Sequence, residues 1–241
     1  YTFNRILLQE TLREWGYTVT SVASAGEALE LIDTHRYHCI ILDIWMPEVD
    51  GLELTRRLRR LEALSRVEST PIIAYTADTD ERTRQHCQAA GIQAVLFKPL
   101  DPQQLALVIQ THCCLTRSQP SREELRDRQQ ATHSGLSQRV LDQMELNPER
   151  IATYARLLWE DITNELMRLD QALQCEERQQ LLEVAHSLKG LCGYLQDPRC
   201  GQLALRLHRE AMTLTFSQLG ELAQQLRQVC VPPLACFDQP Q

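Results

Sequence analysis

The sequence predicts an α/β domain with a parallel sheet, followed by an all-α helical bundle. Its 241 residues are enough for two modest domains. In the first half, short continuous apolar runs alternate with helical patterns, which is typical of a parallel sheet covered on both faces. The second half has no strand pattern and contains long amphipathic segments. We expect domains at residues 1–112 and 137–241, with a linker at 113–136.

The elements of the first half follow from periodicity and capping residues. A helix is expected from Asn4 to Trp15 and a strand from Tyr17 to Val22. Ser24 to Glu27 match the capping box that begins a helix, and Asp101-Pro102 provide an N-cap and an N1 proline for the last helix. Further strands are expected at 39–42, 71–75 and 94–97, and further helices at 24–32, 52–61 and up to Gly91.

The second half reads as an antiparallel helical bundle. It follows a segment rich in Ser, Gln, Arg and Glu, which we interpret as the linker. Asn147-Pro148 cap a long helix that continues to about Leu173. Pro232-Pro233 end the last helix. The other helices are expected at 136–144, 176–195, 197–212 and 217–229.

Composition excludes several classes of function. The net charge of −7 argues against a nucleic-acid partner, because such proteins show a basic footprint. No run of about 18 apolar residues exists, so we expect no membrane contact by this part of the chain. The nine cysteines include no CxxC pair, so zinc is not expected. We interpret them as small apolar side chains in a reducing, cytoplasmic compartment.

Three predicted strands end in side chains that can handle phosphate. Asp43, Thr76 and Lys98 each follow one of these strands. In a parallel α/β sheet such residues meet at one edge, where ligands bind. The carboxylate can act as a nucleophile, and the hydroxyl and ammonium groups can bind the phosphoryl oxygens. Mg²⁺ is the expected cofactor, because it prefers oxygen ligands and phosphate.

The ordered set of motifs resembles a response-regulator receiver domain. It consists of Asp43-Ile44-Trp45-Met46-Pro47, then Asp50-Gly51, Thr76-Ala77 and Lys98-Pro99. The resemblance implies a flavodoxin-like fold with Asp43 as the phospho-acceptor. It also implies that Asp43 and the backbone carbonyl of Trp45 bind Mg²⁺, that Thr76 and Lys98 contact the phosphoryl group, and that the Lys98-Pro99 bond is cis.

Two departures from the receiver pattern affect the expectation. Receivers bind the metal with an acidic pair at the end of their first strand, and the alignment places that pair just before Tyr1. We therefore expect the sequence to begin partway into a longer protein. Val95 stands where signalling receivers often have an aromatic switch residue. This suggests a receiver that passes phosphate on.

His186 is the second candidate phosphate carrier. On a helix it shares one stripe with Lys189, Gly190 and Gly193, because residues three, four and seven apart lie on one face. Leu181, Ala185, Leu188, Cys192 and Leu195 form a separate apolar stripe. We therefore expect an exposed imidazole beside a cation. The other six histidines, His208 among them, are interpreted as ordinary side chains, and no second ligand at metal spacing lies on that face.

Residues Ile151 to Met212 resemble a histidine phosphotransfer domain, through the sequence Ala-His-Ser-Leu-Lys-Gly on a helix after a long helix. The resemblance implies that His186 carries the phosphoryl group and that Lys189 favours the phosphoimidazole. Gly190 and Gly193 would leave room for a docking receiver. Gln196 could hydrogen-bond the imidazole or a phosphate oxygen.

Together the two resemblances indicate a phosphorelay module of a two-component system, such as the C-terminal part of a hybrid sensor histidine kinase. The expected donor is a histidine kinase core, in cis or in trans, and the expected acceptor is the receiver of a separate response regulator. No glycine-rich nucleotide motif is present, so ATP binding is not expected. Two alternatives stay open: an interaction module with an inert receiver in which His186 alone carries phosphate, and a standalone relay protein.

Overall fold

The computed structural model describes residues 1–46, 50–113 and 148–232. Contacts divide the chain into an α/β unit, residues 9–119, and a helical unit, residues 120–241 with residues 1–8. Pro47, nearly all of the expected linker, the short helix predicted at 136–144, Asn147 and Pro233 lie outside the described residues. No helix in the described ranges is long and apolar enough to cross a membrane.

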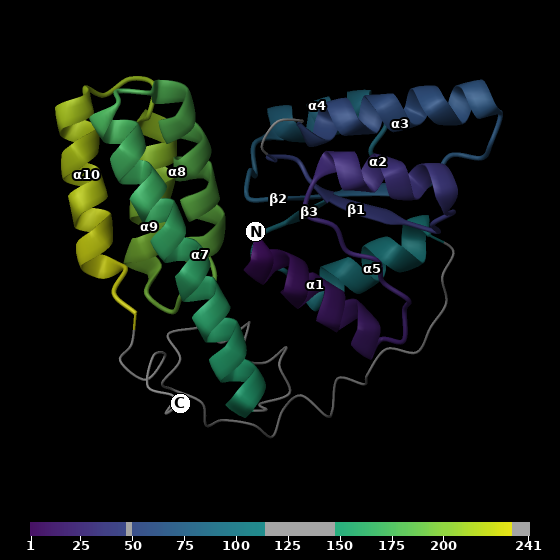
Figure 1. The fold of residues 1–241 in the computed structure, drawn as a ribbon, viewed down its shortest axis with the longest axis horizontal. Helices are drawn as coiled ribbons and strands as arrows, with labels where there is room; N and C mark the ends of the chain where they lie inside the picture. Colours follow the sequence, from purple (N-terminus) through teal and green to yellow (C-terminus); the bar gives the residue numbers. More distant parts are fainter. Residues whose placement is uncertain (47–49, 114–147, 233–241) are drawn as a thin grey trace. The chain divides into compact units, whose positions relative to one another are not determined.

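The α/β unit is built on three parallel strands in the order β1-β2-β3. The sheet register pairs Asp43 with Tyr75 and Thr76 with Phe97. Helices α2, α3 and α4 cover one face, and α5 with the second half of α1 covers the other (Figure 1). The elements are α1 (Thr2–Glu14), α2 (Ala25–Thr34), β1 (Ile40–Asp43), α3 (Gly51–Ser65), β2 (Ile72–Thr76), α4 (Glu81–Ala90), β3 (Ala94–Phe97) and α5 (Pro102–His112).

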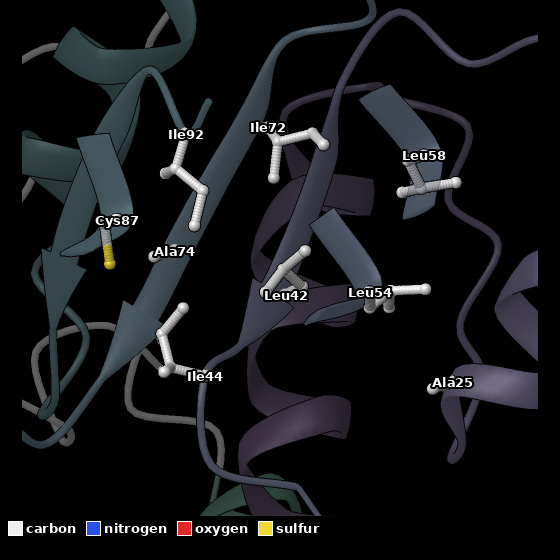
Figure 2. Packing of buried hydrophobic residues seen from close by; sticks show 9 residues of the cluster. All are labelled: Ala25, Leu42, Ile44, Leu54, Leu58, Ile72, Ala74, Cys87 and Ile92. Atoms are coloured by element: carbon white, nitrogen blue, oxygen red, sulfur yellow. The ribbon is translucent and has the colours of Figure 1, made fainter. Parts of the chain in front are cut away.

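One layer of the core of the α/β unit lies between the sheet and the helices α2, α3 and α4. Strand β2 is buried along its whole length, as its continuous apolar run predicts. Figure 2 shows the side chains that fill this layer: Ala25, Leu42, Ile44, Leu54, Leu58, Ile72, Ala74, Cys87 and Ile92. Each large aliphatic side chain buried here contributes about 1.5–3 kcal/mol. This layer therefore fixes the ends of β1 and β2 relative to each other.

The strand predicted from Tyr17 to Val22 is wrong, because this segment forms no ladder. Its side chains do alternate as in a strand: Tyr17 and Val19 are half-buried, and Thr18 and Thr20 are exposed. In the strand order 2-1-3-4-5 of this fold, the second strand pairs only with the first. The described chain has helix α1 as its first element. In the described residues this segment pairs with no strand, and the N–H of Tyr17 donates to the carbonyl oxygen of Leu12 at 3.1 Å.

Most helices begin at the capping residues that the sequence predicts. Asp101 accepts hydrogen bonds from the backbone N–H groups of Gln103 and Gln104 at the start of α5. Ser24 likewise caps α2 by accepting from the N–H of Glu27 at 3.2 Å. The reciprocal half of the predicted capping box differs, because the Glu27 carboxylate accepts from the N–H of Ala23, one residue earlier.

The described part of the helical unit after residue 147 contains four helices that pack as a bundle, and the sequence predicts an antiparallel helical bundle in this half. Successive helices contact one another, and α10 also contacts α7, which closes the ring (Figure 1). Short connections make neighbouring helices antiparallel. The apolar stripe predicted on α8 is buried in its entirety. The helices are α7 (Pro148–Gln174), α8 (Arg178–Cys192), α9 (Pro198–Glu210) and α10 (Phe216–Val229).

Arg178 joins the start of α8 to the turn between α9 and α10. Its guanidinium donates to the carbonyl oxygens of Ala211 at 2.6 Å and Leu214 at 2.8 Å. The same group lies 4.7 Å from the ring centroid of Phe216. These contacts satisfy carbonyls beyond the end of α9 that no helical N–H can reach. Arg178 therefore fixes the position of α9 relative to α8.

Candidate functional site

Asp43 and Lys98 meet at the carboxyl edge of the sheet. The Lys98 ammonium forms an ion pair with Oδ2 of Asp43, and the backbone N–H of Trp45 donates to Oδ1 at 3.2 Å. The side chain of Lys98 is 4% exposed and that of Asp43 22%, so the carboxylate is the part that solvent reaches. Lys98 Nζ also lies 5.4 Å from the ring centroid of Tyr75. A buried cation is thus held against an accessible carboxylate.

Thr76 lies at the end of β2, between the strands that carry the other two residues. Its carbonyl oxygen accepts from the backbone N–H of Lys98 at 2.8 Å, which fixes the start of the segment after β3. Its hydroxyl oxygen accepts from the N–H of Asp78 at 3.1 Å. The three residues predicted from separate motifs therefore converge on one edge. The Lys98-Pro99 peptide is cis, as the resemblance implies.

Gly51 is essential to the shape of this edge. A Cβ atom on Gly51 would collide with the carbonyl oxygen of Asp43, and would lie 2.8 Å from Cδ1 of Leu42 and 2.9 Å from Cα of Ile44. The N–H of Gly51 donates to the carbonyl of Ile44 at 2.9 Å. Asp50 caps α3 by accepting from the N–H of Leu52 at 2.8 Å. The Asp-Gly pair thus lets the start of α3 lie close against the backbone of Asp43 and Ile44.

The side chains at Asp43 can be compared with the ligands that Mg²⁺ prefers. The described residues contain no group of three or more His, Cys, Asp or Glu side chains that could hold a metal ion. Mg²⁺ in phosphate sites is commonly bound by one or two carboxylates together with phosphate oxygens and waters. Asp43 offers one carboxylate and Trp45 a backbone carbonyl close to it. The residues present therefore fit a Mg²⁺ ion whose remaining ligands are phosphoryl oxygens and water molecules.

His186 lies on α8, but the expectation of an exposed imidazole is wrong: the residue is 3% exposed. Eight of the 15 residues of α8 are buried, so more than one stripe of the helix is covered. The physical reason is the place of α8 in the ring, where it packs against α7 and α9 on its two flanks. Gly190 is buried, Lys189 and Gly193 are half-buried, and Gln196 is exposed.

His208 on α9 is a neighbour of His186 that sequence reasoning missed. The two ring centroids lie 5.1 Å apart with the ring planes at 66°, an edge-to-face arrangement. The buried stripe of α9 passes through Ala204 and Leu207, and half-buried His208 lies at its border. The position of His208 at the border of this apolar stripe is the sequence signal that could have indicated a contact with a neighbouring helix. Helical periodicity alone does not pair residues on two helices.

Family models match both parts of the chain. The response regulator receiver domain matches residues 2–110, and the Hpt domain matches residues 153–231. The chain is a receiver domain followed by an Hpt domain. The receiver contains Asp43, Thr76 and Lys98, and the Hpt domain contains His186 and His208. Both resemblances inferred from the motifs are thereby confirmed.

Two curated relatives align with 80% or more of this chain. The sensor histidine kinase AruS of Pseudomonas aeruginosa is 31% identical over 212 residues, which are 87% of this chain and 20% of that protein. The sensory/regulatory protein RpfC of Xanthomonas campestris pv. campestris is 27% identical over 195 residues, 80% of this chain and 27% of that protein. The chain spans about a quarter of the length of these proteins.

Solved structures match the receiver. The receiver domain of the sensor histidine kinase PA1611 from Pseudomonas aeruginosa, crystallised with magnesium in its active-site cleft, is 32% identical. The match covers 48% of this chain and 92% of that domain, with a TM-score of 0.43.

The chain combines a receiver domain with an Hpt domain. This combination makes the chain a phosphorelay module of a two-component system.

Proposed function

We propose that the chain carries a phosphoryl group from a kinase histidine to Asp43, from Asp43 to His186, and from His186 to the receiver of a separate response regulator. The observation that supports this most strongly is the accessible Asp43 carboxylate held by the buried Lys98 ammonium. In this proposal residues 1–112 form the receiver, 113–136 the linker and 137–241 the Hpt domain. The parent protein is a hybrid histidine kinase.

In the first step a carboxylate oxygen of Asp43 attacks the phosphorus atom. The oxygen–phosphorus bond forms as the bond to the kinase imidazole breaks. As the bond forms, the Lys98 ammonium exchanges its contact with the carboxylate for a contact with a phosphoryl oxygen. Lys98 is already buried, so the transfer needs little reorganisation of solvent around it. The Thr76 hydroxyl can donate to a second phosphoryl oxygen while it accepts from Asp78.

Asp43 and the backbone carbonyl of Trp45 would hold Mg²⁺ at this site. The ion would supply positive charge that balances the phosphoryl oxygens. Further oxygen ligands would come from the phosphoryl group and from water. The residues of this chain orient the group, and Lys98 neutralises the carboxylate when the phosphoryl group has left.

In the second step a ring nitrogen of His186 attacks the phosphorus atom of the aspartyl phosphate. The nitrogen–phosphorus bond forms, the bond to Asp43 breaks, and the carboxylate returns to its ion pair with Lys98. His186 as a residue is 3% exposed, so this step requires that one ring nitrogen becomes accessible to the receiver. Gly190 and Gly193 limit the bulk there, while Lys189 and Gln196 offer a cation and an amide to the phosphate.

Acid and base stability of the label tests this proposal. The full chain is incubated with radiolabelled acetyl phosphate and Mg²⁺. We expect label in the wild type that is partly alkali-labile, on Asp43, and partly acid-labile, on His186. The Asp43→Asn variant should lose the alkali-labile part. Alkali-labile label of wild-type amount in Asp43→Asn would contradict the assignment of the acceptor.

A further inference from the structure

We propose that a hydroperoxide oxidises Cys192 and Cys230 to a reversible disulfide, and that this bond regulates the helix that carries His186. The two sulfur atoms lie 3.8 Å apart, although the residues are 38 positions apart in the sequence. Both residues are free thiols in the structure. The disulfide itself needs no assumption about His186, whereas its effect on phosphate transfer rests on the proposed function.

Three buried thiols, which we call the thiol cluster, meet at one end of the bundle. Cys192 is the last residue of α8, Cys200 lies in the first turn of α9, and Cys230 is the C-cap of α10. Cys192 and Cys200 are each 1% exposed, and Cys230 is 5% exposed. Cys230 hydrogen-bonds with both of the others. Its sulfur atom is therefore the centre of the thiol cluster.

The backbone around the thiol cluster allows a disulfide to form. The S–S bond length is about 2.05 Å, so the two sulfur atoms must approach each other by roughly 1.8 Å. Cys192 and Cys230 both lie where a helix ends, and helix ends fray more easily than helix centres. The first turn of α9 lies close to the same place, because a Cβ atom on Gly201 would be 3.8 Å from the carbonyl oxygen of Cys192. The movement needed is small and involves two helix ends.

The thiol cluster should stay reduced at neutral pH. The hydrogen bond with Cys192 raises the pKa of the Cys230 thiol, the hydrogen bond with Cys200 opposes the rise, and burial adds to it. The hydrogen bond with Cys230 and burial also raise the pKa of Cys200. Thiols that keep their protons react slowly, because the thiolate is the nucleophile. The pair should therefore respond to a sustained excess of hydroperoxide.

The oxidation by hydrogen peroxide balances in two steps. In the first, the Cys230 sulfur attacks a peroxide oxygen: an S–O bond forms, the O–O bond breaks, and the thiol proton leaves with the second oxygen as water. In the second, the Cys192 sulfur attacks the sulfenic acid: an S–S bond forms, the S–O bond breaks, and a second water leaves with the Cys192 proton. Two thiols are oxidised and one peroxide is reduced to two waters. An added dithiol reverses the reaction by exchange.

The disulfide would join the end of α8 to the end of α10. Cys192 lies six residues after His186 on the same helix, about 9 Å along the helix axis. His186 is 3% exposed, and phosphate transfer requires that one ring nitrogen becomes accessible. A cross-link between distant residues stabilises the closed bundle and lowers the population of locally opened states. The bond should therefore slow phosphate transfer to His186.

A purely structural role for the thiol cluster makes a different prediction. If the three cysteines only fill space as small apolar side chains, hydroperoxide should leave them reduced. Trypsin separates them into three peptides, residues 190–199, 200–206 and 228–241, and fragment spectra distinguish Cys230 from Cys236. Cys175→Ala is the matched control, because it removes an exposed thiol from the same unit.

The experiment treats the full chain, in the Asp43→Asn background, with excess hydrogen peroxide and then with radiolabelled phosphoramidate. We expect peptides that link Cys192 to Cys230, a melting temperature of the helical unit raised by about 5–10 °C, and labelling of His186 slowed about tenfold. Dithiothreitol should reverse all three changes. Cys175→Ala should respond like the background protein, and peroxide should not slow the labelling of Cys230→Ala.

Peroxide treatment that leaves peptides 190–199 and 228–241 unlinked would overturn the disulfide. A disulfide with an unchanged labelling rate would overturn its regulatory role. If Cys230→Ala does not fold, as judged by its melting curve, Cys192→Ala takes its place, and slowing by peroxide in that variant would also overturn the inference. His186→Gln without peroxide judges the proposed function separately: acid-labile label there refutes His186 as the acceptor, and the peptide map still decides the disulfide.

Discussion

Lys98, after the last strand of the sheet, forms an ion pair with Asp43 at the end of the first described strand, across the end of β2. The backbone N–H of Lys98 is bonded to the carbonyl of Thr76, so the position of the lysine depends on the strand between the partners. A desolvated cation that already faces the carboxylate is suited to stabilise negative charge transferred to it. The geometry of the proposed acceptor site is therefore set by the sheet itself.

Lys98→Met should reduce labelling of Asp43 by acetyl phosphate about 100-fold, because a preorganised cation is lost from the acceptor site. The initial rate of alkali-labile label measures the effect, and a melting curve checks that the receiver is folded. Arg82→Met removes an exposed cation from the first turn of α4 and should leave the rate unchanged. Equal rates for Lys98→Met and the wild type would contradict the role of Lys98.

Gly51→Ala should destabilise the receiver by about 1–3 kcal/mol and lower Asp43 labelling, because the added methyl group collides with the backbone of Asp43 and Ile44. Denaturant unfolding and the labelling rate are the two measurements. Gly220→Ala, where a Cβ meets nothing within 4 Å, is the matched control. It lies in α10 and should stabilise the bundle by about 0.4–1 kcal/mol. A neutral Gly51→Ala would show that the start of α3 tolerates a side chain at this position.

Arg178→Ala should destabilise the Hpt bundle by about 2–3 kcal/mol, because two carbonyls lose hydrogen bonds from a charged donor. The unfolding midpoint of the helical domain measures this. Arg199→Ala is the control, since exposed Arg199 pairs with Asp197, the N-cap residue of its own helix. Its midpoint should stay close to that of the wild type. Similar unfolding midpoints for Arg178→Ala and Arg199→Ala would show that Arg178 does not stabilise the position of α9.

Glu165 should make the stability of the Hpt domain depend on pH. Burial raises the pKa of Glu165, and its hydrogen bond with Arg168 opposes the rise. A raised pKa in the folded state adds stability that is complete below the ordinary carboxyl value of 4.5 and is lost as the pH rises through the folded pKa. Relative to Glu165→Gln, the wild type should therefore gain stability as the pH falls from neutral to about 4.5.

Glu53→Gln provides a comparison of opposite sign. Its hydrogen bond with Arg57 lowers the pKa of the exposed Glu53. Relative to Glu53→Gln, the wild-type receiver should lose stability as the pH falls through the folded pKa of Glu53. Melting curves of the two variants and the wild type at several pH values test both slopes. A wild-type advantage over Glu165→Gln that falls with decreasing pH would contradict the burial argument.

Most of the fold could be predicted from the sequence because each element has local signals. Strand β2 is a continuous apolar run, and α5 begins at an Asp-Pro pair that caps it as expected. The residues at Asp43, Thr76 and Lys98 could be grouped because parallel strands end at a common edge. The cis bond at Lys98-Pro99 followed from the family resemblance alone.

The misses have a common physical origin in contacts between distant segments. The Tyr17 to Val22 segment has the alternation of a strand, but a ladder also needs a partner. The burial of His186 depends on how α8 packs against two neighbouring helices, which helical periodicity does not define. His208 lies 22 residues beyond His186 and meets it only through the fold.

The most direct test of the relay follows the label from a cognate kinase core, with labelled ATP, through the full chain. Wild type, Asp43→Asn and His186→Gln are compared, and acid-labile label in the Hpt domain is measured. The account predicts label on His186 in the wild type and none in the Hpt domain of either variant. Acid-labile label of wild-type amount on His186 in Asp43→Asn would contradict it, because the Hpt domain would then receive phosphate without the receiver.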